Sequence, residues 1–281
     1  MNDGPKAPVG APQRTAKMAG KSLIPYTLGM TISRYLRNGL RLLGSWFESP
    51  PKPEQTEDFA LKTANGFTVT LRARSSDRNV YEDIWEKGVY DVGNLPWPAM
   101  KTIVDIGAHV GFFALYAAAR APEARVIAFE PESESVEALR RNVTDNGLTD
   151  RVRVEATGVA ARDGTRTLHV NPGHAEKNSS YRQRSTSHPV EVPVVGLATV
   201  FETHAIGRCD LLKINCEGEE YEMLYTLPDE LMGRIGAMLI NYHLFSDDPT
   251  HKPERLKEHL EARGFSVTEH PSHIFVARRR S

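Results

Sequence analysis

A glycine-rich turn between an apolar strand and an apolar helix constrains this chain more than any other feature. Residues 102–106 form an apolar run typical of a buried strand, and a second apolar segment begins at Phe112. Gly107 and Gly111 lie in the turn between them. Such a turn allows a ligand to approach the backbone at a helix N-terminus, where N–H groups lack intrahelical partners. The pattern therefore predicts a strand–turn–helix unit of an α/β fold, with a ligand at the turn.

The acidic residues beside this turn favour one class of nucleotide. Dinucleotide-binding turns read G-x-G-x-x-G, whereas Asp105 stands here where the first glycine would be. Its carboxylate would repel a pyrophosphate but attract the amino group of a methionine moiety, directly or through water. A second strand, 125–129, ends in Glu130, which suits the two hydroxyls of a ribose. We therefore expect S-adenosylmethionine (SAM) rather than NAD. A βαβ unit without a ligand is the alternative.

Ligands of open parallel sheets bind beyond the carboxyl ends of the strands. The adenine ring is expected to rest beside the end of the strand at 152–155. The strand ends supply the remaining candidates for cofactor binding, which are Ala108, His109, Phe112, Pro131, Thr157, Gly158 and Asn215.

Strands and helices alternate along most of the chain. Strands are predicted at 102–106, 125–129, 152–155, 210–214 and 236–241, and helices at 111–120, 134–145, 218–226 and 253–263. Ser133 is the expected N-cap of the second helix, and Gly147 its stop. This alternation predicts a mostly parallel sheet with helices on both faces. A closing hairpin at 265–277 adds one antiparallel strand near the edge, and two extended pieces, 165–170 and 190–195, flank a polar loop.

The N-terminal region divides into three parts. Residues 1–20 are expected to be a disordered tail, and 21–57 an amphipathic helix followed by a proline-rich linker. Within the helix, 32–47 carries apolar residues on one face and arginines on the other, so it either packs on the main domain or lies weakly on an anionic membrane. Residues 58–98 are expected to form a cap of one hairpin and one helix, the latter over 80–87 after Ser75-Ser76-Asp77. Residues 99–281 form the predicted SAM-binding domain.

Composition sets broader limits. The net charge of −1 gives no indication of a nucleic-acid partner. The two cysteines, Cys209 and Cys216, have neither the number nor the spacing of a disulfide framework or zinc site. No apolar run approaches 18 residues, and the first residues lack a signal-peptide core. We expect a cytoplasmic protein, with membrane contact only through 32–47.

The segment Asp210-Leu-Leu-Lys-Ile-Asn-Cys-Glu-Gly-Glu-Glu220 resembles the D-x-x-K-I-D-x-E-G-x-E segment of FkbM-type methyltransferases. The Asp-Ile-Gly-Ala-x-x-Gly turn, Glu130-Pro131, Ser75-Ser76-Asp77 with Gly88-x-Tyr90, and Asn178-Ser179-Ser180 match that family too, so the resemblance spans about residues 58–280. It implies a class I SAM-dependent fold with a seven-stranded sheet, and O-methylation of small molecules, often on sugars or secondary metabolites. It also implies a contact between Tyr90 and the cofactor, although aromatic packing is an equal alternative.

Two positions depart from the family pattern. Asn215 replaces an Asp, and Asn241 stands in Asn241-Tyr-His243 where the family tends to show Glu-x-His. Asn orients a hydroxyl but cannot take its proton, which leaves Glu217 and His243 as the candidate proton acceptors. Glu217 is also explained by its place at a helix start, and His243 by ordinary packing. Lys213 is expected to pair with Glu220 or another nearby acid. With fewer carboxylates, no metal ion is expected.

The sequence therefore predicts a SAM-dependent methyltransferase with Asn215, Glu217 and His243 as catalytic residues. Its acceptor is expected to be a hydroxyl of a small molecule or glycan. A non-catalytic SAM-fold binding or scaffold protein is the main alternative, because of the two asparagines. A nucleic-acid methyltransferase is less favoured, since Asn241-Tyr-His-Leu is no base-amine motif.

Overall fold

The computed structural model describes residues 57–170, 187–244 and 248–280, which lie within one compact unit, Glu54–Ser281. The predicted tail 1–20, the amphipathic helix 32–47 and the loop at 178–180 fall outside the described residues. Within the described part, no helix is both long and apolar enough to cross a membrane.

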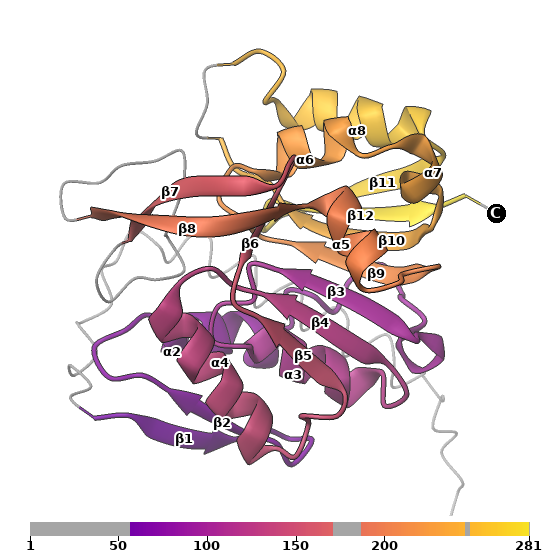
Figure 1. Cartoon of the computed structure of the whole chain (residues 1–281). Coiled ribbons are helices and arrows are strands. Elements are labelled where there is room, and N and C mark those ends of the chain that lie inside the picture. The colour runs from indigo at the N-terminus through magenta and orange to yellow at the C-terminus, as the bar shows by residue number, and fades with distance from the viewer. Residues whose placement is uncertain (1–56, 171–186, 245–247, 281) are drawn as a thin grey trace, which may run out of the picture. The chain divides into compact units, whose positions relative to one another are not determined.

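A seven-stranded sheet carries the fold (Figure 1). Its spatial order is β11 (Phe265–His270), β12 (Ile274–Arg279), β10 (Ile235–Asn241), β9 (Cys209–Ile214), β3 (Thr102–Ile106), β4 (Arg125–Phe129) and β5 (Val152–Glu155). Only β12 runs antiparallel to its neighbours within this sheet. The predicted class I methyltransferase sheet is therefore confirmed.

The chain order reverses at β3, which pairs with β4 on one side and β9 on the other. Asp105 is level with Ala128 of β4 and with Lys213 of β9. Such a reversal opens a crevice at the carboxyl ends of the strands, because the two following connections leave in opposite directions.

Helices cover both faces of the sheet (Figure 1). On one face, Ile103 packs in an apolar cluster with α3 (Phe112–Arg120) and α4 (Ser133–Asp145). On the other, Val104 packs with α5 (Leu197–Thr203), α6 (Glu220–Thr226), α7 (Asp229–Gly233) and α8 (Pro253–Ala262). Neighbouring strand residues point to opposite faces, so a strand buried on both sides is apolar throughout.

Helix α4 corrects one predicted cap. Its N-cap is Glu132 rather than Ser133, because the Glu132 carboxylate accepts hydrogen bonds from the N–H groups of Glu134 (2.9 Å) and Ser135 (2.7 Å). Ser133 is the first helical residue. Gly147 follows the helix with a φ of 64°, as expected of a helix stop.

The predicted hairpin before the main sheet is present as β1 (Phe59–Lys62) and β2 (Thr68–Leu71). The helix after it begins earlier than predicted, at Asp77, and changes character along its length. α2 (Asp77–Tyr81) is followed by a π-helical turn, η1 (Glu82–Glu86), in which the N–H of Lys87 reaches the carbonyl of Glu82. A 3₁₀ turn, η2 (Trp97–Ala99), leads into β3.

A second, smaller sheet stands beside the carboxyl ends of the main strands. It comprises β6 (Gly158–Ala160), β8 (His188–Gly196) and β7 (Gly164–Val170), in that order. β7 and β8 are the two extended pieces predicted from the sequence, paired antiparallel, whereas β6 was not predicted. Its three residues are too few to give a recognisable pattern.

The hairpin is fastened to the main domain by Asn142 of α4. This fully buried side chain accepts from the N–H of Thr70 (2.8 Å) and donates to the carbonyls of Thr70 (3.3 Å) and Val110 (2.9 Å). We expect Asn142→Ala to lower the free energy of unfolding by about 2–4 kcal/mol, because buried backbone groups lose their partners. Urea denaturation measures this change, with Arg140→Ala on the exposed side of the same helix as the control. Equal stability of the two variants would contradict the expectation.

Candidate functional site

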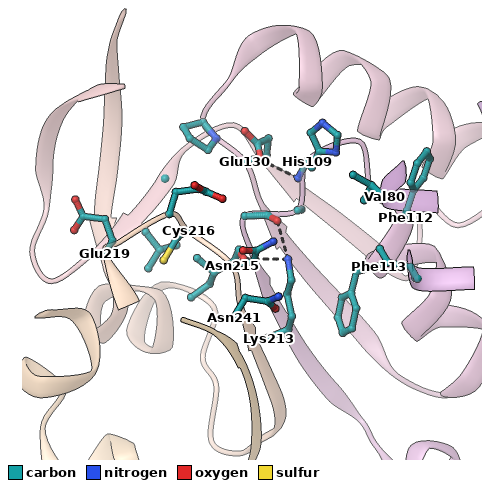
Figure 2. A pocket seen from close by; sticks show the side chains of 18 of the residues that line it. Val80, His109, Phe112, Phe113, Glu130, Lys213, Asn215, Cys216, Glu219 and Asn241 are labelled. Atoms are coloured by element: carbon teal, nitrogen blue, oxygen red, sulfur yellow. Dashed lines mark hydrogen bonds between the residues drawn. The ribbon is translucent and has the colours of Figure 1, made fainter. Parts of the chain in front are cut away.

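A cavity of about 460 Å³ lies at the carboxyl ends of β3, β4 and β9 (Figure 2). Most of the residues predicted from the sequence line it, namely Tyr90, Gly107, Ala108, His109, Phe112, Glu130, Pro131, Gly158, Asn215 and Glu217. Four predicted residues are not part of its lining: Asp105, Gly111, Thr157 and His243. The cavity therefore gathers residues from both sides of the strand-order reversal.

The two glycines of the turn are required by contacts within the protein. Gly107 has a φ of 71°, and a Cβ on it would lie 1.8 Å from the carbonyl oxygen of Asn215. Gly111 has a φ of 88°, and its Cβ would lie 2.3 Å from Leu139 Cδ1. Side chains at these positions would thus push the turn away from β9 and α4. The sequence pattern pointed to the same residues for a different reason, the approach of a ligand.

The N–H groups of the turn are also engaged within the protein. Gly107 and Ala108 both donate to the carbonyl of Phe129, at 3.0 and 2.9 Å, and His109 donates to Glu130 Oε2 at 2.8 Å. Three amides that the sequence pattern offered to a ligand are therefore used to hold the turn against the end of β4.

Asp105 corrects the predicted contact with a methionine amino group. Its fully buried carboxylate lies 2.9 Å from Lys213 Nζ, whose side chain is only 3% exposed. Lys213 also donates to the carbonyl of Gly107 at 2.7 Å. Burial raises the pKa of Asp105, and the adjacent ammonium group opposes this shift. The acid that pairs with Lys213 is thus Asp105, and the pair joins β3 to β9 at the cavity, which Lys213 lines.

Glu130 reaches the cavity from the end of β4, as predicted. Its Oε2 accepts from the His109 N–H, and its Oε1 from the Glu132 N–H at 3.0 Å. The residue is 8% exposed, and this burial raises the pKa of its carboxyl group to about 7. The side chain is therefore fixed in place, and its protonated and ionised forms are about equally populated at neutral pH.

Tyr90 and Asn241 meet across the cavity wall. The Tyr90 hydroxyl donates to Asn241 Oδ1 at 2.8 Å, and its ring packs edge-on against Phe113 at 4.9 Å between centroids. Burial raises the pKa of Tyr90, so this hydroxyl remains a donor at neutral pH. The packing alternative for Tyr90 is thus confirmed, and its contact with the cofactor stays a prediction.

His243 lies between two carboxylates, outside the cavity lining. Its Nε2 is 3.2 Å from Glu217 Oε1, and its Nδ1 is 3.0 Å from Glu220 Oε1. Burial lowers the pKa of the imidazole, but hydrogen bonds to Glu217 and Glu220 outweigh this and raise the pKa to about 10. His243 is therefore a cation at neutral pH and not the proton acceptor expected from the sequence.

Glu217, in contrast, lines the cavity, with its side chain 15% exposed. Its backbone has a φ of 53°, and the next amide, of Gly218, donates to Glu220 Oε2 at 2.8 Å. Glu220 is fully buried and also accepts from the backbone N–H of His243 at 2.7 Å. Glu220 thus fixes both the turn that carries Glu217 and the imidazolium that contacts it.

Sequence reasoning missed several parts of the cavity lining, including Val80, Ile84, Ile274 and one wall formed by β7 and β8. Leu168 of β7 and Val192 and Val194 of β8 line it, and Arg166 forms an ion pair with Glu219 at 3.3 Å beside them. The alternation of apolar and polar residues in β8 was the available signal. Thr157 does not contribute its side chain, because its hydroxyl donates to the carbonyl of Pro193 at 2.9 Å.

Within the described ranges, no group of three or more His, Cys, Asp or Glu side chains is arranged to hold a metal ion. The expectation that no metal takes part stays a prediction.

The buried Asp105–Lys213 pair gives a stability prediction that needs no ligand. We expect Lys213→Met to lower the free energy of unfolding by about 3–5 kcal/mol, since it leaves a buried carboxylate unpaired. Lys101→Met is the matched control, because Lys101 and Glu123 are both largely exposed and lie 3.9 Å apart. Urea denaturation should show a large loss for the first variant and partial recovery in Asp105→Asn/Lys213→Met. Equal losses at Lys213 and Lys101 would show that the buried pair carries no special stability.

The model of the family "Methyltransferase FkbM domain" matches residues 105–267. Methyltransferase sdnD of Sordaria araneosa is 28% identical, covering 67% of this chain and 82% of that protein. The 31-O-demethyl-FK506 methyltransferase FkbM of Streptomyces tacrolimicus is 25% identical over 65% of this chain and 81% of that protein.

A solved structure of Methyltransferase FkbM from Methylobacillus flagellatus is 15% identical, with a TM-score of 0.42. The match covers 63% of this chain and 43% of that one. The family model extends from the last part of β3 into β11 and so includes the strand-order reversal, but not the parts of the cavity lining at 80–90 and 272–274. Because this match spans more than half of the chain, the protein belongs to the FkbM methyltransferase family and is a methyltransferase.

Proposed function

We propose that this methyltransferase uses SAM and transfers the methyl group to a hydroxyl of a small molecule or glycan. The observation that carries the proposal is the position of Glu130. A carboxylate fixed at the end of β4, beside the glycine turn of β3, is placed to accept hydrogen bonds from a ribose diol. Each of its oxygens has a second lone pair beyond the one used within the protein.

The neighbouring residues fit the rest of a nucleoside. Pro131, Gly158 and Val159 form an apolar part of the lining next to Glu130. A Cβ at Gly158 would lie 3.0 Å from Val194 Cγ1 and 3.6 Å from Pro131 Cβ, so any larger residue would fill this space. These residues would hold the adenine, and Asn215 and Tyr90 are placed to contact the methionine end.

Bound SAM supplies a methyl group already activated by its sulfonium. The chain must then place the acceptor oxygen in line and exclude water, and positioning of this kind accounts for about 7–11 kcal/mol of barrier in well-oriented systems. Glu217 is the residue that we assign to accept the hydroxyl proton, because its carboxylate lines the cavity. His243 fixes the orientation of Glu217, and Asn215 orients the hydroxyl.

The acceptor class is supported by two observations. The relative from S. tacrolimicus is named for O-methylation of a demethylated small molecule, FK506. The cavity also has apolar lining apart from the nucleoside end, from Val80, Ile84, Leu168, Val192 and Ile274. This lining suits the carbon skeleton of an acceptor whose hydroxyl is directed toward Glu217.

Methyl transfer from labelled SAM to components of a lysate of the source organism tests the proposal directly. We expect S-adenosylhomocysteine (SAH) to bind in calorimetry and a small hydroxylated product to be labelled. Glu217→Gln should bind SAH within twofold of the parent protein but lose at least tenfold in transfer rate. Binding without transfer to any component would favour the scaffold alternative, for which Asn215 and Asn241 argue. No binding of SAH by the folded protein would refute the proposal.

The pKa of Glu130 predicts a pH dependence. If the ribose binds the carboxylate form, SAH affinity should rise about tenfold between pH 6 and pH 8, since the group titrates at about 7. Glu130→Gln should remove this rise, and it also controls for titration of the ligand itself. The unliganded protein should lose stability as pH rises from 4.5 through 7, because the folded state retains a proton that the unfolded chain releases. A pH-independent affinity would argue against ribose binding by Glu130.

A further inference from the structure

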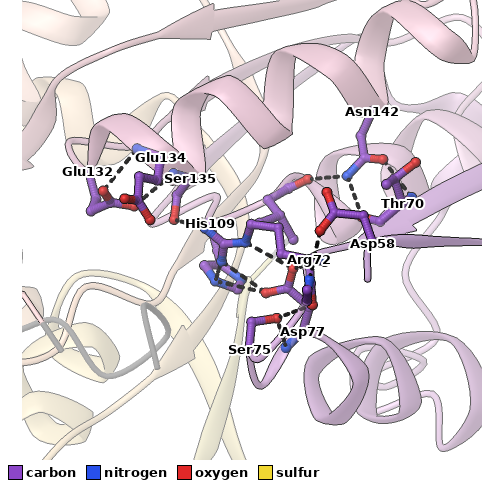
Figure 3. A network of polar contacts seen from close by, with 12 residues as sticks. Asp58, Thr70, Arg72, Ser75, Asp77, His109, Glu132, Glu134, Ser135 and Asn142 are labelled. Atoms are coloured by element: carbon purple, nitrogen blue, oxygen red, sulfur yellow. Dashed lines mark hydrogen bonds and ion pairs between the residues drawn. The ribbon is translucent and has the colours of Figure 1, made fainter. Parts of the chain in front are cut away.

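A polar network outside the cavity links the first hairpin to the cofactor turn (Figure 3). At its centre is Arg72, which follows β2 and has a side chain that is 16% exposed. Its Nε and Nη2 donate to the two carboxylate oxygens of Asp77 at 3.0 and 2.9 Å. The backbone N–H of Arg72 donates to Asp77 Oδ2 as well, at 2.9 Å. Asp77 is fully buried, so the guanidinium is held at a fixed position.

The guanidinium then reaches two other elements. Its Nη2 lies 2.8 Å from His109 Nε2 in the turn after β3, and its Nη1 donates to Ser135 Oγ of α4 at 3.2 Å. His109 has a φ of 51°, a left-handed conformation that is unfavourable for a residue with a Cβ. The strain at this position requires surrounding contacts to maintain it.

These contacts close a ring of hydrogen bonds around Glu130. Glu130 accepts from the backbone of His109 and of Glu132, and Glu132 caps α4 at Ser135. Arg72 completes the ring, because it contacts both Ser135 and the His109 side chain. A displacement of Arg72 would therefore release the turn on one side of Glu130 and the helix start on the other.

We infer that Arg72, clamped by Asp77, is a positioning residue for the cofactor site, acting through His109 on the turn and on Glu130. This inference rests on the proposed use of SAM. It makes the segment that precedes β3 part of the cofactor site, although Arg72 and Asp77 do not line the cavity. Burial alone would raise the pKa of Asp77, but the hydrogen bonds and the positive charge of Arg72 keep it below its ordinary value.

The first test measures SAH affinity by calorimetry. Arg72→Lys and Arg72→Gln should each raise Kd at least tenfold, since a lysine cannot reproduce the fork that meets Asp77 and His109 together. Arg141→Gln is the matched control, because Arg141 of α4 also contacts the hairpin region, through Asp58 at 3.2 Å, but its side chain is 45% exposed. The control should keep its affinity within twofold.

A double-mutant cycle separates positioning from a general loss of structure. His109→Asn keeps a residue that tolerates the left-handed backbone but shortens the side chain. If Arg72 acts through His109, this change should weaken SAH binding in the parent protein yet add less than twofold in the Arg72→Gln background. Should Arg72→Gln not fold, Arg72→Lys serves in the cycle. An affinity of Arg72→Lys within twofold of the parent, or equal factors in both backgrounds, would overturn the inference.

A ligand-free measurement keeps this test distinct from the proposed function. Donation from Arg72 to His109 Nε2 requires the ring proton to sit on Nδ1. Nitrogen NMR of the imidazole should therefore show the Nδ1–H tautomer in the parent protein and its loss in Arg72→Gln. A failure of SAH to bind would remove the proposed function alone, whereas an Nε2–H tautomer in the parent protein would remove the role of Arg72.

Discussion

The buried ion pair between Asp105 and Lys213 is the interaction on which the site depends. It joins β3 and β9, the two strands between which the chain order reverses, and its Lys213 side lines the cavity. Lys213 also holds the Gly107 carbonyl, and Gly107 in turn packs against the backbone of Asn215. The distance between the glycine turn after β3 and the segment that carries Glu217 is thus set by two features. These are the ammonium group of Lys213 and the absence of a side chain at Gly107.

Around this pair, the carboxylates of the site have separate tasks. The Asp105 carboxylate forms the ion pair that joins β3 to β9. The Glu220 carboxylate accepts hydrogen bonds from the backbone N–H groups of His243 and Gly218. Glu130 and Glu217 each contact other groups of the protein and also line the cavity. His243 lies between the carboxylates of Glu217 and Glu220. The positive charge of the imidazolium compensates the two carboxylates, which allows the three groups to lie close together at a partly buried position.

The sequence predicted the elements well because the information for them is local. Apolar runs and glycine positions gave most of the strands and helices to within a few residues, although α5, α7 and β6 were not predicted. Most of the site residues predicted at the strand ends line the cavity, but they make up less than half of its lining. The sequence could not predict which side chains contact one another in the folded protein. Asp105 meets Lys213, and Arg72 meets His109, across separations that no local pattern encodes. The family resemblance identified 210–220 as important but not that Glu220 would bind His243 at both its backbone and its ring.

The π-helical turn at Glu82–Glu86 has a consequence for how this region tolerates change in length. A π turn holds one residue more than an α turn at the same point of a helix. Deleting one residue there would restore regular α-helical winding. Lys87, which ends this turn and lines the cavity, would then shift by one position in the helical register. Single-residue deletions in η1 should therefore alter the shape of the cavity beside Lys87 while leaving the sheet intact.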